Sequence, residues 1–369
     1  MKSRIRRIVL VLTGAALLAG AATAIVPPGY RLIQVTRNDN LELQPKNNNL
    51  GQFVFAKRIG TFGEDERDDI MFYDGEQLIN ITSDTRHPRR DATPDINDNG
   101  NIVWRRAIGP QGPFGRTTEI MIYSDGETYR LTDDDLDDRA PRINNLGHIV
   151  WNKADRLGCL ETSAQLMYYD GEDFYQLTDD LYSNQGAEIN DRNQIVWTRY
   201  DFCDYPNWDS DVLLWENGVV TQLDAPEEFE PQNAHINNLG VVAWQTRNRD
   251  TGVNSIRLWR DGVTTVFTDW GWNPRLNDLG DIYFLRWHDD VQLWQSWAFL
   301  NDQLYQLSND GFSNYDGDIN NAGRIIWQSG DIPWSDIRLL EPFSNKRRER
   351  GEGGQLAPSL DARPFDPNP

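Results

Sequence analysis

Residues 141–151 read Pro-Arg-Ile-Asn-Asn-Leu-Gly-His-Ile-Val-Trp, and this stretch contains a phrase that recurs along the chain. The phrase is Asn, then Asn or Asp, any residue, a turn residue, any residue, two apolar residues and an aromatic residue. Seven copies begin at Asn48, Asn97, Asn144, Asn190, Asn237, Asn277 and Asn320. Successive copies lie 40–49 residues apart. This period, with several short β segments per copy, is typical of a β-propeller.

Each copy predicts a blade of four short strands. In the third copy these are an inner strand at 141–143, a second strand at 149–151, a third strand at 166–169, and a fourth strand that ends at Thr178. The fourth position of the phrase is Gly in six copies and Asn193 in the other. These residues accept a positive φ, so this position predicts a tight turn between the inner and second strands.

The two ends of the repeat region predict how the ring closes. Fourth strands end at a hydroxyl or an Asp in only six places: Thr82, Thr132, Thr178, Asp224, Thr268 and Ser308. The last copy stops after its third strand at 337–340, whereas residues 31–36 match a fourth strand. We therefore expect an all-β fold, a seven-bladed propeller over residues 30–342, in which the N-terminal segment completes the last blade and leaves no open edge.

With a proline-led inner strand, an Asx-x-Gly turn, an aromatic-Asp-Gly turn and a closing Gln-Leu-Thr, the chain resembles the TolB-like propellers of exported bacterial proteins. The resemblance spans nearly all of residues 30–342. It implies a binding scaffold for protein or peptide partners. TolB itself has six blades, and the shared motif specifies a blade without any chemistry, so no functional residue carries over.

The segments outside the repeats predict an exported protein. Residues 1–24 combine a basic start, an apolar run and Ala22-Thr23-Ala24, as in a cleaved secretory signal. The alternative is a retained anchor, since apolar or small residues continue to Val26. With the signal cleaved, no stable membrane span is expected, and the protein is periplasmic or secreted. Residues 343–369, rich in Gly, Pro and Arg, are predicted to be a flexible tail.

A ring of ionisable residues is predicted at the propeller axis, one from each inner strand. Its members are Lys46, Asp95, Arg142, Glu188, His235, Arg275 and Asp318. Their signs alternate around the ring, and His235 stands where an odd ring must break the alternation. One interpretation is a set of ion pairs that holds the blades in register. The other is a polar channel that binds a small zwitterion or an ion.

The loops that join second to third strands vary most, and such loops on a rigid scaffold commonly carry binding sites. Cys159 and Cys203 occupy equivalent loops of adjacent blades, which predicts a disulfide in an exported protein. Aromatic residues gather there as well, and these can grip sugars or peptides, or pack as small loop cores. The predicted binding residues are Tyr205, Trp208, Phe229, Trp270, Trp272, Trp287, Trp294 and Tyr315.

Composition and motifs narrow the function classes. A net charge of −21 argues against nucleic-acid binding. No nucleophile elbow, zinc-protease helix motif or phosphate loop occurs, so no catalytic residue is assigned. Acid clusters such as Asp133-Asp134-Asp135 make Ca²⁺ the one ion worth testing, although none matches a twelve-residue calcium loop. No other metal or cofactor is expected.

These observations lead to the expectation of a non-enzymatic propeller that binds an extracytoplasmic protein or peptide through its variable loop face. Two alternatives remain open at this stage. A lectin-like propeller is favoured by loop tryptophans, and a polysaccharide-degrading enzyme would need paired carboxylates from separate loops.

Overall fold

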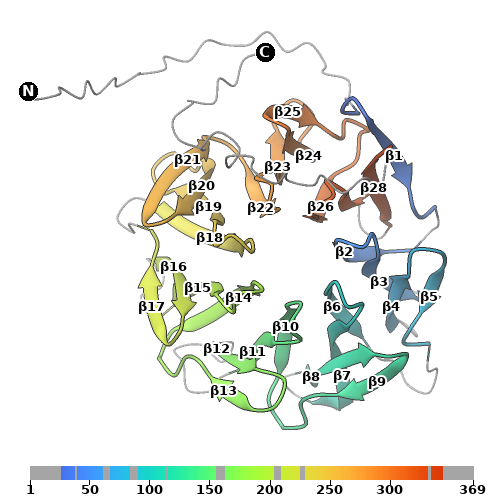
Figure 1. Ribbon diagram of the computed structural model, residues 1–369, viewed down its shortest axis with the longest axis vertical. Coiled ribbons are helices and arrows are strands. Elements are labelled where there is room, and N and C mark those ends of the chain that lie inside the picture. The colour runs from blue at the N-terminus through green and yellow to red at the C-terminus, as the bar shows by residue number, and fades with distance from the viewer. Residues whose placement is uncertain are drawn as a thin grey trace, which may run out of the picture.

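The computed structural model describes residues 26–37, 40–60, 67–83, 90–112, 115–154, 163–202, 209–224, 229–330 and 334–343. Within these ranges the regular structure is all strand, arranged as seven four-stranded antiparallel sheets around a common axis (Figure 1). The prediction of a seven-bladed propeller is confirmed. The predicted signal at 1–24 and almost all of the predicted tail lie outside the described residues, as do Cys159, Cys203, Tyr205 and Trp208.

The two strands nearest the axis contain the repeated phrase. The inner strands are β2 (Glu42–Asn47), β6 (Asp91–Ile96), β10 (Asp138–Ile143), β14 (Ser183–Ile189), β18 (Phe229–Ile236), β22 (Trp272–Leu276) and β26 (Asn314–Ile319). The second strands are β3 (Phe53–Ile59), β7 (Ile102–Gly112), β11 (Ile149–Ala154), β15 (Ile195–Asp201), β19 (Val242–Asn248), β23 (Ile282–His288) and β27 (Ile325–Ser329). The turn between them has a positive φ at its fourth position, including 58° at Asn193, as predicted.

The other two strands form the outside of each blade. The third strands are β4 (Arg67–Tyr73), β8 (Gly115–Ser124), β12 (Ala164–Tyr169), β16 (Asp209–Glu216), β20 (Asn254–Arg260), β24 (Leu293–Leu300) and β28 (Asp336–Pro342). The fourth strands are β5 (Leu78–Asn80), β9 (Glu127–Arg130), β13 (Phe174–Gln176), β17 (Val219–Gln222), β21 (Val263–Thr268), β25 (Gln303–Gln306) and β1 (Tyr30–Gln34).

The ring closes through β1, which is the fourth strand of the last blade. β1 pairs with β28 in antiparallel register from Tyr30 opposite Pro342 to Gln34 opposite Arg338. Figure 1 shows this blue strand beside the red C-terminal strands. The predicted exchange is therefore confirmed.

The hydrophobic core lies between neighbouring blades. The repeat aromatics Trp104, Trp151, Trp197, Trp244 and Trp327 are all fully buried. Four of these indoles donate a hydrogen bond to a residue thirteen positions earlier, at or near the start of the inner strand: Asp91, Asp138, Asn184 and Asn314, at 2.8–3.0 Å. This contact fixes the second strand of a blade to its own inner strand.

The carboxylate that accepts from Trp151 makes stability depend on pH. Burial raises the pKa of Asp138 to about 6, so the native state holds the proton more tightly than the unfolded chain does. Its contribution to stability is present at low pH and is lost as pH rises from about 4 through 6. Above pH 6 the ionisation of buried Asp138 lowers the free energy of unfolding by up to ~3 kcal/mol, since one pKa unit corresponds to about 1.4 kcal/mol.

We predict that Asp138→Asn raises the free energy of unfolding by about 1–3 kcal/mol at pH 8 and has little effect at pH 4. An amide can accept the same indole bond, as Asn184 does from Trp197. Urea denaturation at the two pH values measures the effect. The matched variant Asn184→Asp should lose stability at pH 8, and a stabilised Asn184→Asp would contradict the argument.

Candidate functional site at the ring axis

Two closed rings of hydrogen bonds surround the axis at the turns of the repeated phrase. In the first ring, the side-chain amide of each leading Asn donates to the main-chain oxygen of the leading Asn in the next blade. All seven bonds are present at 2.7–3.0 Å, and the last runs from Asn320 back to Asn48. The leading Asn of the phrase is thus a connector between blades.

The second ring, which we name the mouth ring, comprises the second residues of the phrase. Its members alternate between amide and carboxylate: Asn49, Asp98, Asn145, Asp191, Asn238, Asp278 and Asn321. Each backbone N–H donates to the Oδ1 atom of the next member at 2.7–2.8 Å. Since seven is odd, the alternation breaks once, at the junction of Asn321 and Asn49.

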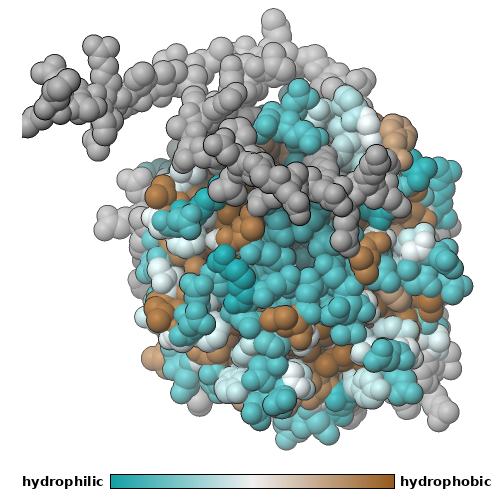
Figure 2. Space-filling view, viewed as in Figure 1, coloured by the Kyte–Doolittle hydropathy of each residue, from teal (hydrophilic) through white to brown (hydrophobic). Residues whose placement is uncertain are grey.

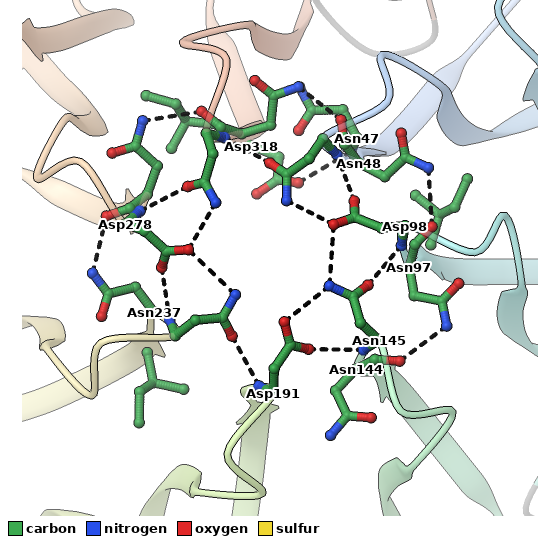
Figure 3. Close-up of a pocket in the computed structure, with 18 of the residues that line it drawn as sticks. Asn47, Asn48, Asn97, Asp98, Asn144, Asn145, Asp191, Asn237, Asp278 and Asp318 are labelled. Atoms are coloured by element: carbon green, nitrogen blue, oxygen red, sulfur yellow. Dashed lines mark hydrogen bonds between the residues drawn. The ribbon is translucent and has the colours of Figure 1, made fainter. Parts of the chain in front are cut away.

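The asparagine amides of the mouth ring donate to its carboxylates, and Asn145 bridges the two on either side of it. The Nδ2 atom of Asn145 donates to Oδ2 of Asp98 at 3.1 Å and to Oδ2 of Asp191 at 2.9 Å. Figure 3 shows these side chains joined around the opening. The ring therefore holds three carboxylates, each in a fixed orientation, at the edge of one cavity.

That cavity has a volume of about 160 Å³ and is lined by the turn residues together with His235 and Asp318. The surface around the axis on the face shown in Figure 2 is predominantly hydrophilic. At roughly 30 Å³ per water molecule, the cavity has room for about five waters or one small organic molecule.

The charge belt, meaning the seven predicted ionisable residues of the inner strands, lies beside the mouth ring. The backbone changes direction there, because the pairing of each inner strand with its second strand shifts register just before the belt residue, as between Ala92 and Asp95. Such bulges turn a side chain away from the regular alternation. Ion pairs in the belt join Lys46 to Asp318 at 3.9 Å and Arg142 to Glu188 at 3.1 Å.

Glu188 is the centre of the belt, since Arg275 also approaches it at 3.8 Å. Burial alone would raise the pKa of Glu188, but the charges of Arg142, Lys46 and Arg275 outweigh burial and hold the pKa well below its usual range. Burial raises the pKa of Asp95 to about 6 despite the nearby bases. The belt is therefore not a uniform set of alternating pairs.

His235 lies between Glu188 and Arg275 in the belt sequence, and neither neighbour decides its protonation. Burial lowers the pKa of His235 to about 3, against the opposing charge of Glu188. Its Nδ1 atom accepts a hydrogen bond from the backbone N–H of Leu276 at 3.4 Å. The neutral ring therefore carries its proton on Nε2, which makes it a donor in the wall of the cavity.

The predicted loop aromatics of the sixth blade pack against one another. The rings of Trp272 and Trp294 lie 5.5 Å apart, and Trp287, which is 38% exposed, lies 5.3 Å from Trp294. Trp270 packs 5.3 Å from Trp297. These four predicted residues form small cores at the strand ends. Tyr315 is half-buried, and the side chain of Phe229 is outside the described set.

Sequence reasoning missed the mouth ring as a site, although its signal was in the repeated phrase. The second position of the phrase is either Asn or Asp, and the strict order of the two around the ring is the signal for it. Within the described residues, no group of three or more His, Cys, Asp or Glu side chains could hold a metal ion, and no helix could span a membrane.

Comparisons with known proteins identify the fold alone. No protein-family model and no curated protein sequence matches the chain. Among solved structures, oligogalacturonate lyase from Vibrio parahaemolyticus matches with a TM-score of 0.63 and 10% identity, covering 86% of this chain and 95% of that one. The β-propeller domain of the Trilobed protease from Pyrococcus furiosus matches with a TM-score of 0.61 and 11% identity, covering 84% and 95%.

TolB from Acinetobacter baumannii also matches, with a TM-score of 0.43 and 12% identity, over 78% of this chain and 59% of that one. The chain is thus a β-propeller, and the finer resemblance to TolB-like proteins is not established. Several peptidases also match, and the chain spans about half of their length.

These matches correct the functional expectation. The expected non-enzymatic propeller with a protein or peptide partner on its loop face is wrong, because the similar solved propellers are mostly enzymes or domains of enzymes. The expectation rested on the TolB-like scaffold, and a shared propeller fold does not carry that scaffold's role over to this chain.

Proposed function

We propose that the axial cavity is the ligand site of this protein and that it takes a small organic cation bearing a hydrogen-bond acceptor. The observation that carries the proposal is the alternation in the mouth ring, which sets three carboxylates at one cavity of about 160 Å³. A fourth carboxylate, that of Asp318, lines the same cavity. Carboxylates fixed by amides and walled by a protein interior attract positive charge.

The size of the axial cavity and the polar groups in its wall favour an organic cation over a bare metal ion. The carboxylates belong to different blades, and the described residues contain no group that could surround one ion. An ammonium group can instead lie among the mouth-ring carboxylates while an acceptor on the same molecule meets the Nε2–H of His235. This arrangement uses both kinds of group in the cavity wall.

The test is calorimetric titration of the full chain with ethanolamine, ethylammonium, ethylene glycol and Ca²⁺. Ethanolamine should bind more tightly than ethylammonium, which lacks the acceptor, and ethylene glycol, which lacks the charge, should not bind. Binding of Ca²⁺ but not of the amines would contradict the proposal. Because similar propellers are enzymes, the recovered ligand is also analysed for chemical change.

We predict that Asp191→Asn weakens ethanolamine binding by roughly tenfold, equal to about 1.4 kcal/mol. The substitution removes one charge and keeps an oxygen that can accept the backbone N–H of Asn145. The ring already tolerates one junction of two asparagines, between Asn321 and Asn49. The control is Asp170→Asn, in an exposed turn of the third blade, and equal affinity of the two variants would refute the site.

A further inference from the structure

The last strand of the chain, β28, ends on the face of the propeller that carries the mouth ring. Glu341 of β28 lies 3.4 Å from the guanidinium Nε of Arg324. Arg324 closes the mouth turn of the seventh blade, because its main-chain oxygen accepts the N–H of Asn320 at 3.1 Å. The backbone stays bonded one residue beyond β28, where the N–H of Phe343 donates to the oxygen of Gly29 at 2.9 Å. The last described residue therefore lies at the mouth face.

A basic segment, which we name the tail cluster, follows this point in the sequence. It comprises Lys346, Arg347, Arg348 and Arg350, with Glu349 between the last two. The tail cluster lies outside the described residues, so only its charge and its place in the chain enter the argument. No other five consecutive residues include four Lys or Arg, and the whole chain carries a net charge of −21. This segment is the densest positive charge that the sequence offers to the mouth-ring carboxylates.

The spacing along the chain allows the tail cluster to reach the mouth ring. One strand separates β28 from the inner strand β26, so the two lie about 10 Å apart at a strand spacing of about 4.8 Å. Lys346 follows Pro342 by four residues, and Arg350 follows it by eight. At up to about 3.3 Å per residue, these positions can extend about 13 and 26 Å from the end of β28. A basic side chain of the tail cluster can therefore pass β26 and enter the axial opening.

The mouth has acceptor capacity that its own amides leave unused. The Oδ2 atoms of Asp98 and Asp278 each accept from two asparagine side chains. The Oδ2 atom of Asp191 accepts from Asn145 alone among the described residues. The Oδ1 atom of Asn47, in the wall of the same cavity, is buried and has no hydrogen-bond partner in the part of the chain that the structure describes. Each of these oxygens suits a guanidinium, which carries five donors and no acceptor.

We propose that the tail cluster occupies the mouth of the axial cavity when no ligand is bound, with one of its arginines paired to Asp191. The inference rests on the proposed function, because the segment presents a cation to the same carboxylates as the small ligand does. A guanidinium and a carboxylate form short, charge-assisted hydrogen bonds. A short connection within one chain also holds the two groups at a high effective concentration, so even a weak contact is populated. The tail cluster is thus a built-in competitor for the axial site.

The experiment compares the full chain with a full-length neutral-tail variant that carries Lys346→Gln, Arg347→Gln, Arg348→Gln and Arg350→Gln. The NMR signals of the Asn145 side-chain amide report on the mouth ring. These signals should differ between the two proteins, and about 1 M salt should remove the difference by screening the charges. A synthetic peptide of residues 344–352, added to the neutral-tail variant, should restore the native signals. Identical Asn145 signals in the two proteins would overturn the proposal.

Matched substitutions in the neutral-tail background locate the contact. Asp191→Asn should weaken binding of the peptide about tenfold, because it removes the carboxylate with unused capacity. Asp170→Asn, in an exposed turn of the third blade, should bind the peptide as its parent does. Equal affinities of these two proteins would indicate attraction to acidic surface in general and overturn the proposal. Asn145 signals that change with protein concentration would assign the mouth to the tail of a second copy, which would also overturn it.

Titration with ethanolamine separates this inference from the proposed function. The neutral-tail variant should bind ethanolamine severalfold more tightly than the native chain does, because its mouth is unoccupied. Peptide binding at the mouth ring without ethanolamine binding to either protein would support the tail contact and show that the proposed small ligand is wrong. Equal ethanolamine affinities of the native chain and the neutral-tail variant would overturn the tail cluster as a competitor.

Discussion

Replacing Glu188 with Gln is expected to lower the free energy of unfolding by about 3–5 kcal/mol at pH 7. Glu188 is the shared partner of Arg142 and Arg275 in the charge belt. Removing one member of a buried ionic group leaves the remaining charges without compensation, and this is among the largest effects of a single substitution. Urea denaturation of both proteins at pH 7 measures the difference.

The size of this effect should depend on pH in a defined direction. Because the folded-state pKa of Glu188 lies below that of the unfolded chain, its contribution is present above pH 4.5 and is lost as pH falls. The difference between the native chain and Glu188→Gln should therefore shrink at pH 3. Asp95→Asn is the control in the same belt.

Asp95 should behave differently because burial raises its pKa, so its ionisation at pH 7 costs stability instead of adding to it. We expect Asp95→Asn to stay within about 1 kcal/mol of the native stability. Equal losses of stability in Glu188→Gln and Asp95→Asn would show that the belt behaves as a uniform ring of ion pairs. Such a result would contradict the unequal ion-pair distances of the belt.

Removal of the chain through residue 36 is expected to abolish the folded monomer. The truncation deletes β1 and leaves β28 as an unpaired edge, which invites association with other chains. It also removes Thr36, whose hydroxyl bonds Glu42 of the first blade and accepts the N–H of Ile337 at 2.8 Å. The loss should exceed about 5 kcal/mol, the lower end of typical domain stability.

Circular dichroism and size-exclusion chromatography test this prediction. The matched control is a truncation through residue 25, which retains every residue of β1 and Thr36. The longer truncation should unfold or form oligomers while the control stays monomeric. A monomer with an unchanged melting temperature after loss of β1 would contradict the closure argument.

Much of the fold could be read from local sequence. Hairpin turns depend on residues that accept a positive φ, so Gly147 and its equivalents marked every turn. The buried repeat tryptophans followed from the spacing of the phrase, because a residue at a fixed place in a repeated strand meets the same environment in each blade. The missing fourth strand revealed the closure, since a ring leaves no strand without a partner.

The candidate site could be predicted only in part. The ionisable residues of the charge belt were identified from their fixed position in the inner strand. The protonation of His235 could not be predicted, because burial outweighs the opposing charge of Glu188 and burial is a property of the assembled ring. Likewise, Trp287 and Trp294 looked like separate loop residues, and strand pairing places their rings in contact.

The sequence by itself determined the number of blades, the turns, the buried aromatics and the strand that closes the ring. These features depend on interactions within one repeat or on counting repeats. Only the tertiary structure decided that Asn48 bonds Asn97 and that Asp98 lies between Asn49 and Asn145. Those contacts join residues more than forty positions apart, and their energies depend on desolvation that exists only once the blades have packed.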